Sequence, residues 1–498
     1  MPDARSGNRE IWQRGANGVA LVCALLSVVV FVRRGLDAWE TAGIAPGVAI
    51  TSGCEGESFY AIWRAVHGET IYTDAARLPY GAAYFNWLFY AGYAGPVRAA
   101  VNRIDDTVIP RAGRLVTAAG ALLGVGGLFW LLSRVLRGQW LTAAGVATFV
   151  YFGPLVGWWA HTVRPDVWAL ALETTGLALL LLNYQRRPLA AVLTSCLLFY
   201  GAWSFKQTYV LGLGGAVLFL LFRRQWRWAG ILSGGSVVLW CLTFLTLGPS
   251  YRAAFRSTST TNVYYLALGL NNLVDLIQKT APLWLMAAPA LLWPTRPDDL
   301  QPRAPPVSDA CLMGLLGLLV ALPLSFAASC KLGAASYYYF TAEVMLALLA
   351  AGLVARSGSP TMVLLGFVTA LGVQSLVGFG YVGQVSQIPQ ARGLAATWAA
   401  WRTQPVPRYA SINNLNEPWL NPGSPPFVIA YNYWLDRTAG RPFETDGLGG
   451  LISSGYFRTL LLPADTRGEY DGGSLNLYVR GQTINGFTVF HRSDTLRP

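Results

Sequence analysis

Two acidic residues in the first polar segment of the chain have the chemistry of a general base. Glu55 and Glu57 lie within residues 52–93, a segment that separates the first two apolar runs and becomes rich in tryptophan and tyrosine. A carboxylate above a membrane surface can take the proton of an acceptor hydroxyl while that hydroxyl attacks a substrate. The same acids would also stabilise a helix N-terminus through the helix dipole. Their spacing of two does not place both side chains in one site, so we expect at most one of them to be the base.

Basic residues that could meet a phosphate are scarce. Only Lys206, Lys279 and Lys331 among the 37 basic residues are lysines, and all three fall in segments that we expect on the outer side of the membrane. Arg164 stands at the mouth of a span on that side. Cations that converge from several helix ends favour a polyanion, most simply a phosphate. We expect Lys206, Lys331 and Arg164 to bind phosphate, with contacts to lipid headgroups as the alternative. Lys279 fits a surface helix equally well.

Further polar residues lie near these cations or inside the apolar runs. Asp166 follows Arg164 and either joins the site or caps its own helix. Glu173 lies two turns deeper on the same helix face. An acid within a span costs ~2.5–3.5 kcal/mol by insertion scales, so Glu173 and Glu343 should each have a role or a buried partner. His161 could bind a metal ion or donate a hydrogen bond to phosphate, although a lone histidine at a span mouth is more often structural.

The composition indicates that membrane helices hold these residues. Hydrophobic residues make up 53% of the 498 residues and charged residues only 12%, whereas a soluble domain carries roughly a quarter charged residues. A crossing helix needs about 20 apolar residues, and on that basis we expect about eleven spans. The predicted spans begin near Gly15, Ala112, Gln139, Asp166, Leu189, Tyr209, Trp228, Ala281, Asp309, Tyr339 and Met362.

The basic residues between the apolar runs predict the orientation. Pairs such as Arg186 and Arg187, or Arg223 and Arg224, occur in alternate loops, which is the pattern of cytoplasmic loops. The net charge of +12 is therefore a topology signal, because a nucleic-acid-binding protein would cluster its charge on one face or tail. We expect no nucleic-acid partner. We expect a multi-pass protein of a bacterial-type cytoplasmic membrane, with its N-terminus inside and its C-terminal domain outside.

The cysteines give no metal or redox motif. The six cysteines are scattered without a CxxC pair, which excludes the common motifs of both kinds. Cys54 and Cys330 share the outer compartment and could form a disulfide. The sequence requires no metal ion, and it leaves open a divalent cation that helps a leaving group.

Polar segments divide the chain into two predicted domains. Residues 1–384 form the membrane module. Its first outer loop, 35–111, should hold one helix over 57–67 and a second helix beyond Pro79 that lies in the membrane interface. Residues 385–498 form an exterior α/β domain that is large enough to have its own core. Its expected strands cover 457–462, 474–479 and 487–491, and its expected helices cover 389–403 and 426–438.

Four segments of the membrane module resemble the GT-C glycosyltransferases, which include the protein O-mannosyltransferases and the aminoarabinose transferases that modify lipid A. The segments are CEGESFYAIWRAVHGETIYTDAARLPYG, HTVRPDVWALAL, SFKQTYV and KLGAASYYYFTAE. The resemblance covers residues 53–350 and implies a polyprenyl-phosphate sugar donor and a lipid, glycan or protein acceptor. It places the base at Glu55, with Glu57 second, and the donor phosphate near Arg164, Lys206 and Lys331. We expect His161, Asp166, Tyr338 and Glu343 to support the site.

The choice between the two acids stays open, because the family often has Asp-Glu or Gly-Glu-Gly where this chain has Cys-Glu-Gly-Glu. The predicted reaction is a single inverting displacement on the outer face of the membrane. One alternative is a transporter or flippase for lipid-linked oligosaccharides, which would need polar groups along a path at the membrane midplane. The other alternative is a non-catalytic membrane scaffold, which leaves the outward acids and lysines unexplained.

Overall fold

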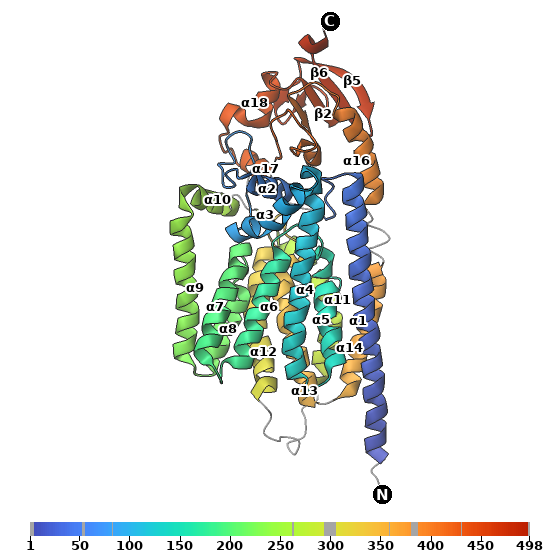
Figure 1. Cartoon of the computed structure of the whole chain (residues 1–498), viewed down its shortest axis with the longest axis vertical. Coiled ribbons are helices and arrows are strands. Elements are labelled where there is room, and N and C mark those ends of the chain that lie inside the picture. The colour runs from blue at the N-terminus through green and yellow to red at the C-terminus, as the bar shows by residue number, and fades with distance from the viewer. Residues whose placement is uncertain are drawn as a thin grey trace.

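A bundle of long helices carries a smaller domain at one end (Figure 1). The computed structural model describes residues 4–51, 55–81, 83–260, 263–292, 305–357, 359–379, 387–429 and 431–496. The N-terminus and the C-terminal domain lie at opposite ends of the bundle, and α1 (Ala4–Ile44) connects the two ends. Within these described residues, eight helices are long and apolar enough to cross a membrane. The predicted polytopic helical fold with a small C-terminal α/β domain is therefore confirmed.

The predicted spans correspond to helices of the bundle, although the count of eleven is not confirmed. The long apolar helices in the described ranges are α1, α4 (Ile109–Val135), α6 (Asp166–Asn183), α7 (Pro188–Phe205), α9 (Trp226–Thr246), α12 (Pro305–Ser329), α13 (Phe340–Ser357) and α14 (Pro360–Val373). Two apolar helices are shorter, α5 (Trp140–Phe152) and α8 (Leu211–Phe222). The helix α11 (Leu266–Leu292) begins before the predicted Ala281. It extends further because Asp275 and Lys279, which interrupt the apolar run, pair with each other across one turn at 2.8 Å.

Glycines allow α12 and α13 to pack closely. A Cβ atom on Gly314 would lie 2.6 Å from the backbone nitrogen of Leu349, and one on Gly317 would overlap the side chain of Met345. Small residues at such positions let membrane helices approach at backbone distance. The two helices therefore have a well-defined separation, and this fixes the chain segments at their outer ends.

The first outer loop contains its first helix where predicted, but its second helix begins later. α2 covers Glu55–His67. α3 (Trp87–Val101) begins after Asn86, whose side chain accepts a hydrogen bond from the Trp87 amide at 3.1 Å. The prediction that the helix starts just beyond Pro79 is wrong, because Tyr80 has a φ of 62° and a right-handed helix cannot include that conformation.

The C-terminal domain contains a four-stranded sheet in the order β1-β2-β6-β5, in which β1 and β2 are parallel and the other pairs antiparallel. Its strands are β1 (Arg408–Ala410), β2 (Thr459–Pro463), β5 (Tyr478–Ile484) and β6 (Phe487–Arg492), with a separate pair β3 (Glu469–Tyr470) and β4 (Gly473–Ser474). The strands predicted at 457–462 and 487–491 are confirmed. The strand predicted at 474–479 is divided between β4 and β5, and the three-residue β1 was too short to predict.

Three helices accompany this sheet: α16 (Ile388–Trp401), α17 (Tyr431–Thr438) and α18 (Gly447–Ser453). α16 was predicted. α17 begins later than the predicted residue 426, because Pro425 and Pro426 favour an extended chain before it. α18 was not predicted.

The C-terminal domain is attached to the first outer loop by side chains from both partners. Tyr80 lies fully buried in the core of the domain, where its ring centroid is 5.6 Å from that of Tyr433. Its hydroxyl donates to the Glu444 carbonyl at 2.7 Å. The Trp419 indole donates to the Pro46 carbonyl at 2.8 Å. These contacts hold the domain against the segments on either side of α2.

Two predictions involve residues outside the described ranges. The predicted domain boundary at 384–385 lies within residues 380–386, which the structure does not describe. Cys54 also lies outside the described residues. Cys330 is buried, and its predicted disulfide with Cys54 falls outside the described residues.

Candidate functional site

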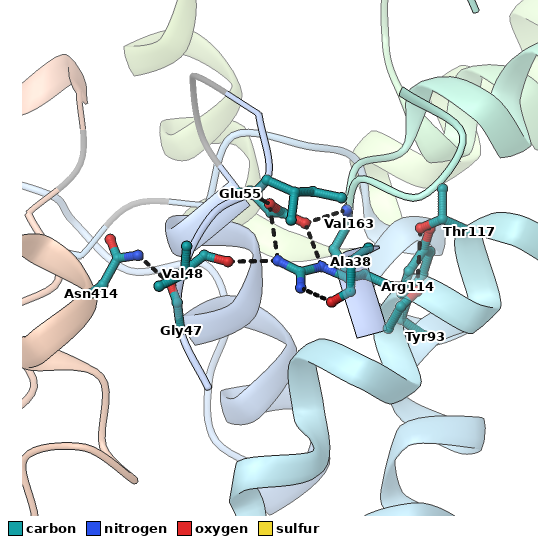
Figure 2. Close-up of polar contacts among 11 residues, drawn as sticks. Ala38, Gly47, Val48, Glu55, Tyr93, Arg114, Thr117, Val163 and Asn414 are labelled. Carbon is teal, nitrogen blue, oxygen red and sulfur yellow. Dashed lines mark hydrogen bonds and ion pairs between the residues drawn. The ribbon is translucent and has the colours of Figure 1, made fainter. Parts of the chain in front are cut away.

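Glu55, the first residue of α2, forms a buried ion pair with Arg114 of α4 (Figure 2). Arg114 Nε lies 3.3 Å from Glu55 Oε1, and the two side chains are 4% and 0% exposed. The backbone amides of Ile50 and Val163 donate to the same carboxylate at 2.7 and 3.0 Å. A buried ion pair is stable only when its remaining hydrogen-bonding positions are filled. Here both carboxylate oxygens accept hydrogen bonds.

Arg114 extends this network to α1. Its Nη1 donates to the Ala38 carbonyl at 2.9 Å, and its Nη2 donates to the Val48 carbonyl at 2.6 Å (Figure 2). Asn414 of the C-terminal domain donates to the Gly47 carbonyl next to Val48. One guanidinium therefore joins α4 to the end of α1 and to the chain that leads into α2. Glu55 and Arg114 hold the first outer loop on the bundle.

The same ion pair brings the acidic loop next to the predicted cations. Val163, whose amide donates to Glu55, is followed directly by Arg164. The Tyr93 hydroxyl of α3 donates to the Arg164 carbonyl at 3.3 Å and lies 2.7 Å from the Thr117 hydroxyl of α4. The acidic and basic segments that were far apart in the sequence are therefore adjacent in space.

Arg164 and Lys206 share one carboxylate. Lys206 Nζ lies 2.5 Å from Asp166 Oδ1, and Arg164 Nε lies 3.2 Å from Asp166 Oδ2. None of the three side chains is more than 6% exposed. Asp166 begins α6, and Lys206 follows the last residue of α7 in an extended conformation. Two cations share one anion here, and arginine and lysine are the side chains that bind phosphate in proteins.

A cavity of about 210 Å³ is lined by Asp166, Lys206 and Tyr337. Arg164, which pairs with Asp166, is not among its lining residues. The rest of its wall is mainly apolar and comes from the α7–α8 connection, α12 and the start of α13; it includes Leu211, Leu324 and Ala328. A cavity that is lined by a buried lysine–aspartate pair and by a mainly apolar wall suits an amphiphile with a polar head group.

Aromatic rings from the short helix η4 (Ser336–Tyr339) cover the cations. The Tyr337 ring centroid lies 4.1 Å from Lys206 Nζ and 4.3 Å from Arg164 Cζ. The predicted supporting residue Tyr338 also lines the cavity, with its ring 5.2 Å from Lys206 Nζ. Ser325 of α12 donates to the Tyr338 carbonyl at 2.7 Å. Cation–π contacts of this kind orient a buried cation without neutralising it.

Other predicted site residues do not line this cavity. Lys331 lies beyond α12, half-buried, and its backbone forms a bridge with Tyr264. Glu57 is half-buried in the first turn of α2. Glu343 is buried in α13, where neither carboxylate oxygen has a hydrogen-bond partner in the part of the chain that the structure describes. The structure gives the positions of Lys331, Glu57 and Glu343, but their contacts do not indicate a role for any of them.

His161 is held in a structural contact. Its Nε2 donates to the Phe31 carbonyl of α1 at 2.9 Å. Burial, with a smaller contribution from the nearby Arg34, lowers the pKa of His161 to about 4. The imidazole is therefore neutral at physiological pH. Among the described residues, no group of three or more histidine, cysteine, aspartate or glutamate side chains is placed to hold a metal ion.

Two charged residues of this region were missed by the sequence analysis. Arg114 stands at the start of the predicted second span, and the cost of a charge inside an apolar run was the signal that could have found it. Glu417 of the C-terminal domain gave no signal in the sequence. It is fully buried, and its Oε1 lies 3.8 Å from the position that a Cβ atom on Gly56 would take.

The environment of Glu417 disfavours its charged form. Neither carboxylate oxygen has a hydrogen-bond partner among the residues that the structure describes. Burial, followed by the negative charge of Glu57, raises the pKa of Glu417 well above its usual value of 4.5. Glu417 is thus an acid of the C-terminal domain that faces the start of α2.

The fold and the cavity define a polytopic membrane protein built around a buried basic site at one end of its helices. No protein-family model and no curated protein matches the sequence. Solved structures do match. ArnT from Cupriavidus metallidurans in the apo state aligns with a TM-score of 0.61 at 13% identity, over 95% of this chain and 98% of that chain. The same protein bound to undecaprenyl phosphate gives a TM-score of 0.60 at 13% identity, over 95% and 99%.

A third structure is the archaeal oligosaccharyltransferase AglB from Archaeoglobus fulgidus in complex with an inhibitory peptide and a dolichol-phosphate. It aligns with a TM-score of 0.50 at 12% identity, over 97% of this chain and 75% of that chain. Both proteins have the GT-C fold. The present chain therefore has the GT-C fold.

Breaking the pair between Glu55 and Arg114 should destabilise the protein, because each single substitution leaves one buried charge without its partner. We expect Glu55→Gln and Arg114→Met each to cost about 3–5 kcal/mol, which is measured as a lower melting temperature in detergent. The double variant should recover part of this loss. Single variants that melt with the wild-type protein would show that the pair does not hold the loop.

Glu417→Gln should stabilise the protein at neutral pH. The folded-state pKa of Glu417 is raised, so its contribution to stability is complete at low pH and is lost as the pH rises toward the folded-state pKa. The melting temperature of the variant relative to wild type should therefore increase from about pH 4 to about pH 8. The exposed Glu469, replaced by glutamine, is the control and should give a flat difference. A difference for Glu417→Gln that falls with rising pH would contradict this account.

Proposed function

We propose that the protein is a membrane glycosyltransferase that moves a sugar from a polyprenyl-phosphate donor to a lipid, glycan or protein acceptor. The observation that carries the proposal is the buried group of Arg164, Lys206 and Asp166, of which Lys206 and Asp166 line a mainly apolar cavity. The GT-C fold and the undecaprenyl phosphate bound to one structural neighbour support the same donor class. The protein would act at the outer face of a bacterial-type cytoplasmic membrane.

The donor phosphate would lie beside Lys206, and the polyprenyl chain would follow the apolar wall of the cavity. In the reaction, the acceptor oxygen attacks the anomeric carbon while the bond from that carbon to the phosphate oxygen breaks. The polyprenyl phosphate leaves with the negative charge. Lys206 and Arg164 would stabilise that charge, and Asp166 would keep both cations oriented toward one point.

The proton of the acceptor hydroxyl must pass to a base, and we propose Glu57 for this part. Both oxygens of Glu55 are occupied by Arg114 and by two backbone amides, and its side chain is 0% exposed. Glu55 would instead position the loop. Glu57 stands one helical position beyond Gly56 in the first turn of α2 and is half-buried, so an acceptor could approach it.

A flippase or transporter for lipid-linked oligosaccharides is the main rival. Such a protein would carry polar groups along a path through the membrane. The described cavity instead has a mainly apolar wall, and Asp166 and Lys206 are the charged residues that line it. A non-catalytic scaffold would have no need of a buried cationic cavity.

Transfer should depend on Lys206. We expect Lys206→Ala to reduce transfer of labelled sugar from polyprenyl phosphate by about 10²-fold or more, because it removes a charged stabiliser of the leaving group. Lys279→Ala is the matched control, since Lys279 pairs with Asp275 in α11 and does not line the cavity. Wild-type protein without transfer activity toward any acceptor, or a Lys206→Ala variant with full activity, would reject the proposal.

Substitutions of Glu55 and Glu57 should affect different properties of the protein. Glu57→Gln should reduce transfer by about 10²-fold or more through loss of the base, while the melting temperature and the affinity for undecaprenyl phosphate stay close to wild type. Glu55→Gln should lower the melting temperature. Normal turnover in Glu57→Gln would remove Glu57 as the base.

A further inference from the structure

Glu173 is an acid inside a membrane helix that the proposed reaction does not use. It lies in α6, two helical turns from Asp166, which is about 10 Å along the helix axis. Its side chain is buried, with the residue 1% exposed. Both of its oxygens have partners: Oε1 accepts from the Gly212 amide at 2.7 Å, and Oε2 accepts from the Thr341 hydroxyl at 2.5 Å.

The contact with Gly212 holds the start of α8. Gly212 is the second residue of that helix, and its amide is one of those that the helix itself cannot satisfy. The Glu173 carboxylate takes the place of an N-cap side chain and also favours the positive end of the helix dipole. A Cβ atom on Gly212 would lie 2.5 Å from the carboxylate carbon, so this approach requires glycine.

The contact with Thr341 holds the start of α13. Thr341 lines the cavity, and so does Leu211, the neighbour of Gly212. Asp166 lines the cavity from the same helix that carries Glu173. One carboxylate thus connects three helices that contribute residues to the cavity, α6, α8 and α13.

We infer that Glu173 is a positioning residue for the lipid part of the donor: it sets the spacing of α6, α8 and α13, three of the helices that line the cavity. This inference rests on the proposed function, because it assigns the cavity to a polyprenyl phosphate. It explains why this position holds an acid, although an apolar residue would have a lower free energy of membrane insertion. Two hydrogen bonds to a carboxylate fix helix positions more narrowly than apolar contacts do.

Asp309 provides a matched control at the other end of the same helices. It lies in α12, accepts from the Tyr184 hydroxyl at 2.8 Å and pairs with Arg223. Tyr184 follows α6 and Arg223 follows α8. Asp309 therefore connects α6 and α8 as Glu173 does, but it does not line the cavity or contact a residue that does.

The experiment measures the melting temperature of purified protein in detergent and its dissociation constant for undecaprenyl phosphate. Glu173→Ala and Asp309→Ala should both lower the melting temperature. Only Glu173→Ala should weaken undecaprenyl phosphate binding, by about tenfold or more, because it releases the cavity walls. Glu173→Gln keeps an oxygen for the Gly212 amide and an amide that can donate to Thr341, so it should bind within about threefold of wild type.

The outcomes separate this inference from the proposed function. Glu173→Ala that binds as wild type does, or Asp309→Ala that weakens binding equally, would overturn the positioning role while the donor proposal stands. A Glu173→Gln variant as weak as Glu173→Ala would also overturn it, because the two hydrogen bonds would then not be what matters. Wild-type protein that does not bind undecaprenyl phosphate would overturn the donor proposal and this inference together.

Discussion

The buried ion pair between Glu55 and Arg114 is the interaction on which the end of the bundle next to the C-terminal domain depends. Its side chains are 0% and 4% exposed, and such a pair is favourable only when the neighbouring groups complete its hydrogen bonds. Those groups come from α1, from the chain before α2 and from the turn at Val163. Few arrangements of these segments satisfy all the contacts at once. The pair therefore determines the position of the first outer loop more closely than apolar packing, which tolerates small shifts.

The position of that loop in turn determines where the cations lie. The Val163 amide donates to Glu55, and Arg164 is the next residue in the chain. Asp166, at the start of α6, pairs with Arg164 and with Lys206 at the end of α7. Arginine and lysine are the side chains that bind phosphate in proteins, and the cavity beside Lys206 has a mainly apolar wall. Under the proposed function, an anionic head group would meet these cations and an apolar tail would fill the remaining space. The same physical argument disfavours a small soluble anion, which would leave the apolar wall empty.

The sequence predicts the helical bundle well because a long apolar run is a local signal. It predicts the cations Arg164 and Lys206 through their scarcity and their expected side of the membrane. The expected side of the membrane predicts the depth of a residue along the helices but not its lateral position. It therefore could not show that Lys206 lines the cavity and that Lys331 does not. Tyr80 shows the same limit. Its aromatic neighbours predict an interfacial helix, whereas its partner Tyr433 lies in a different domain, and no local pattern reports a contact over that separation in sequence.

Under the proposed function, the contacts of the acids indicate that Glu55 and Asp166 have structural roles and that a different acid is the base. A base must accept a proton and then carry it without losing its structural partners. Glu55 and Asp166 fail this condition, because protonation would weaken buried pairs with Arg114, Arg164 and Lys206. Glu57 has a different neighbour, Glu417, whose pKa its negative charge raises. The C-terminal domain therefore places a second carboxyl group at the start of α2, where Glu417 Oε1 lies 3.8 Å from the position of a Cβ atom on Gly56. Under the proposed function, that domain would form part of the reacting face as well as covering the first outer loop.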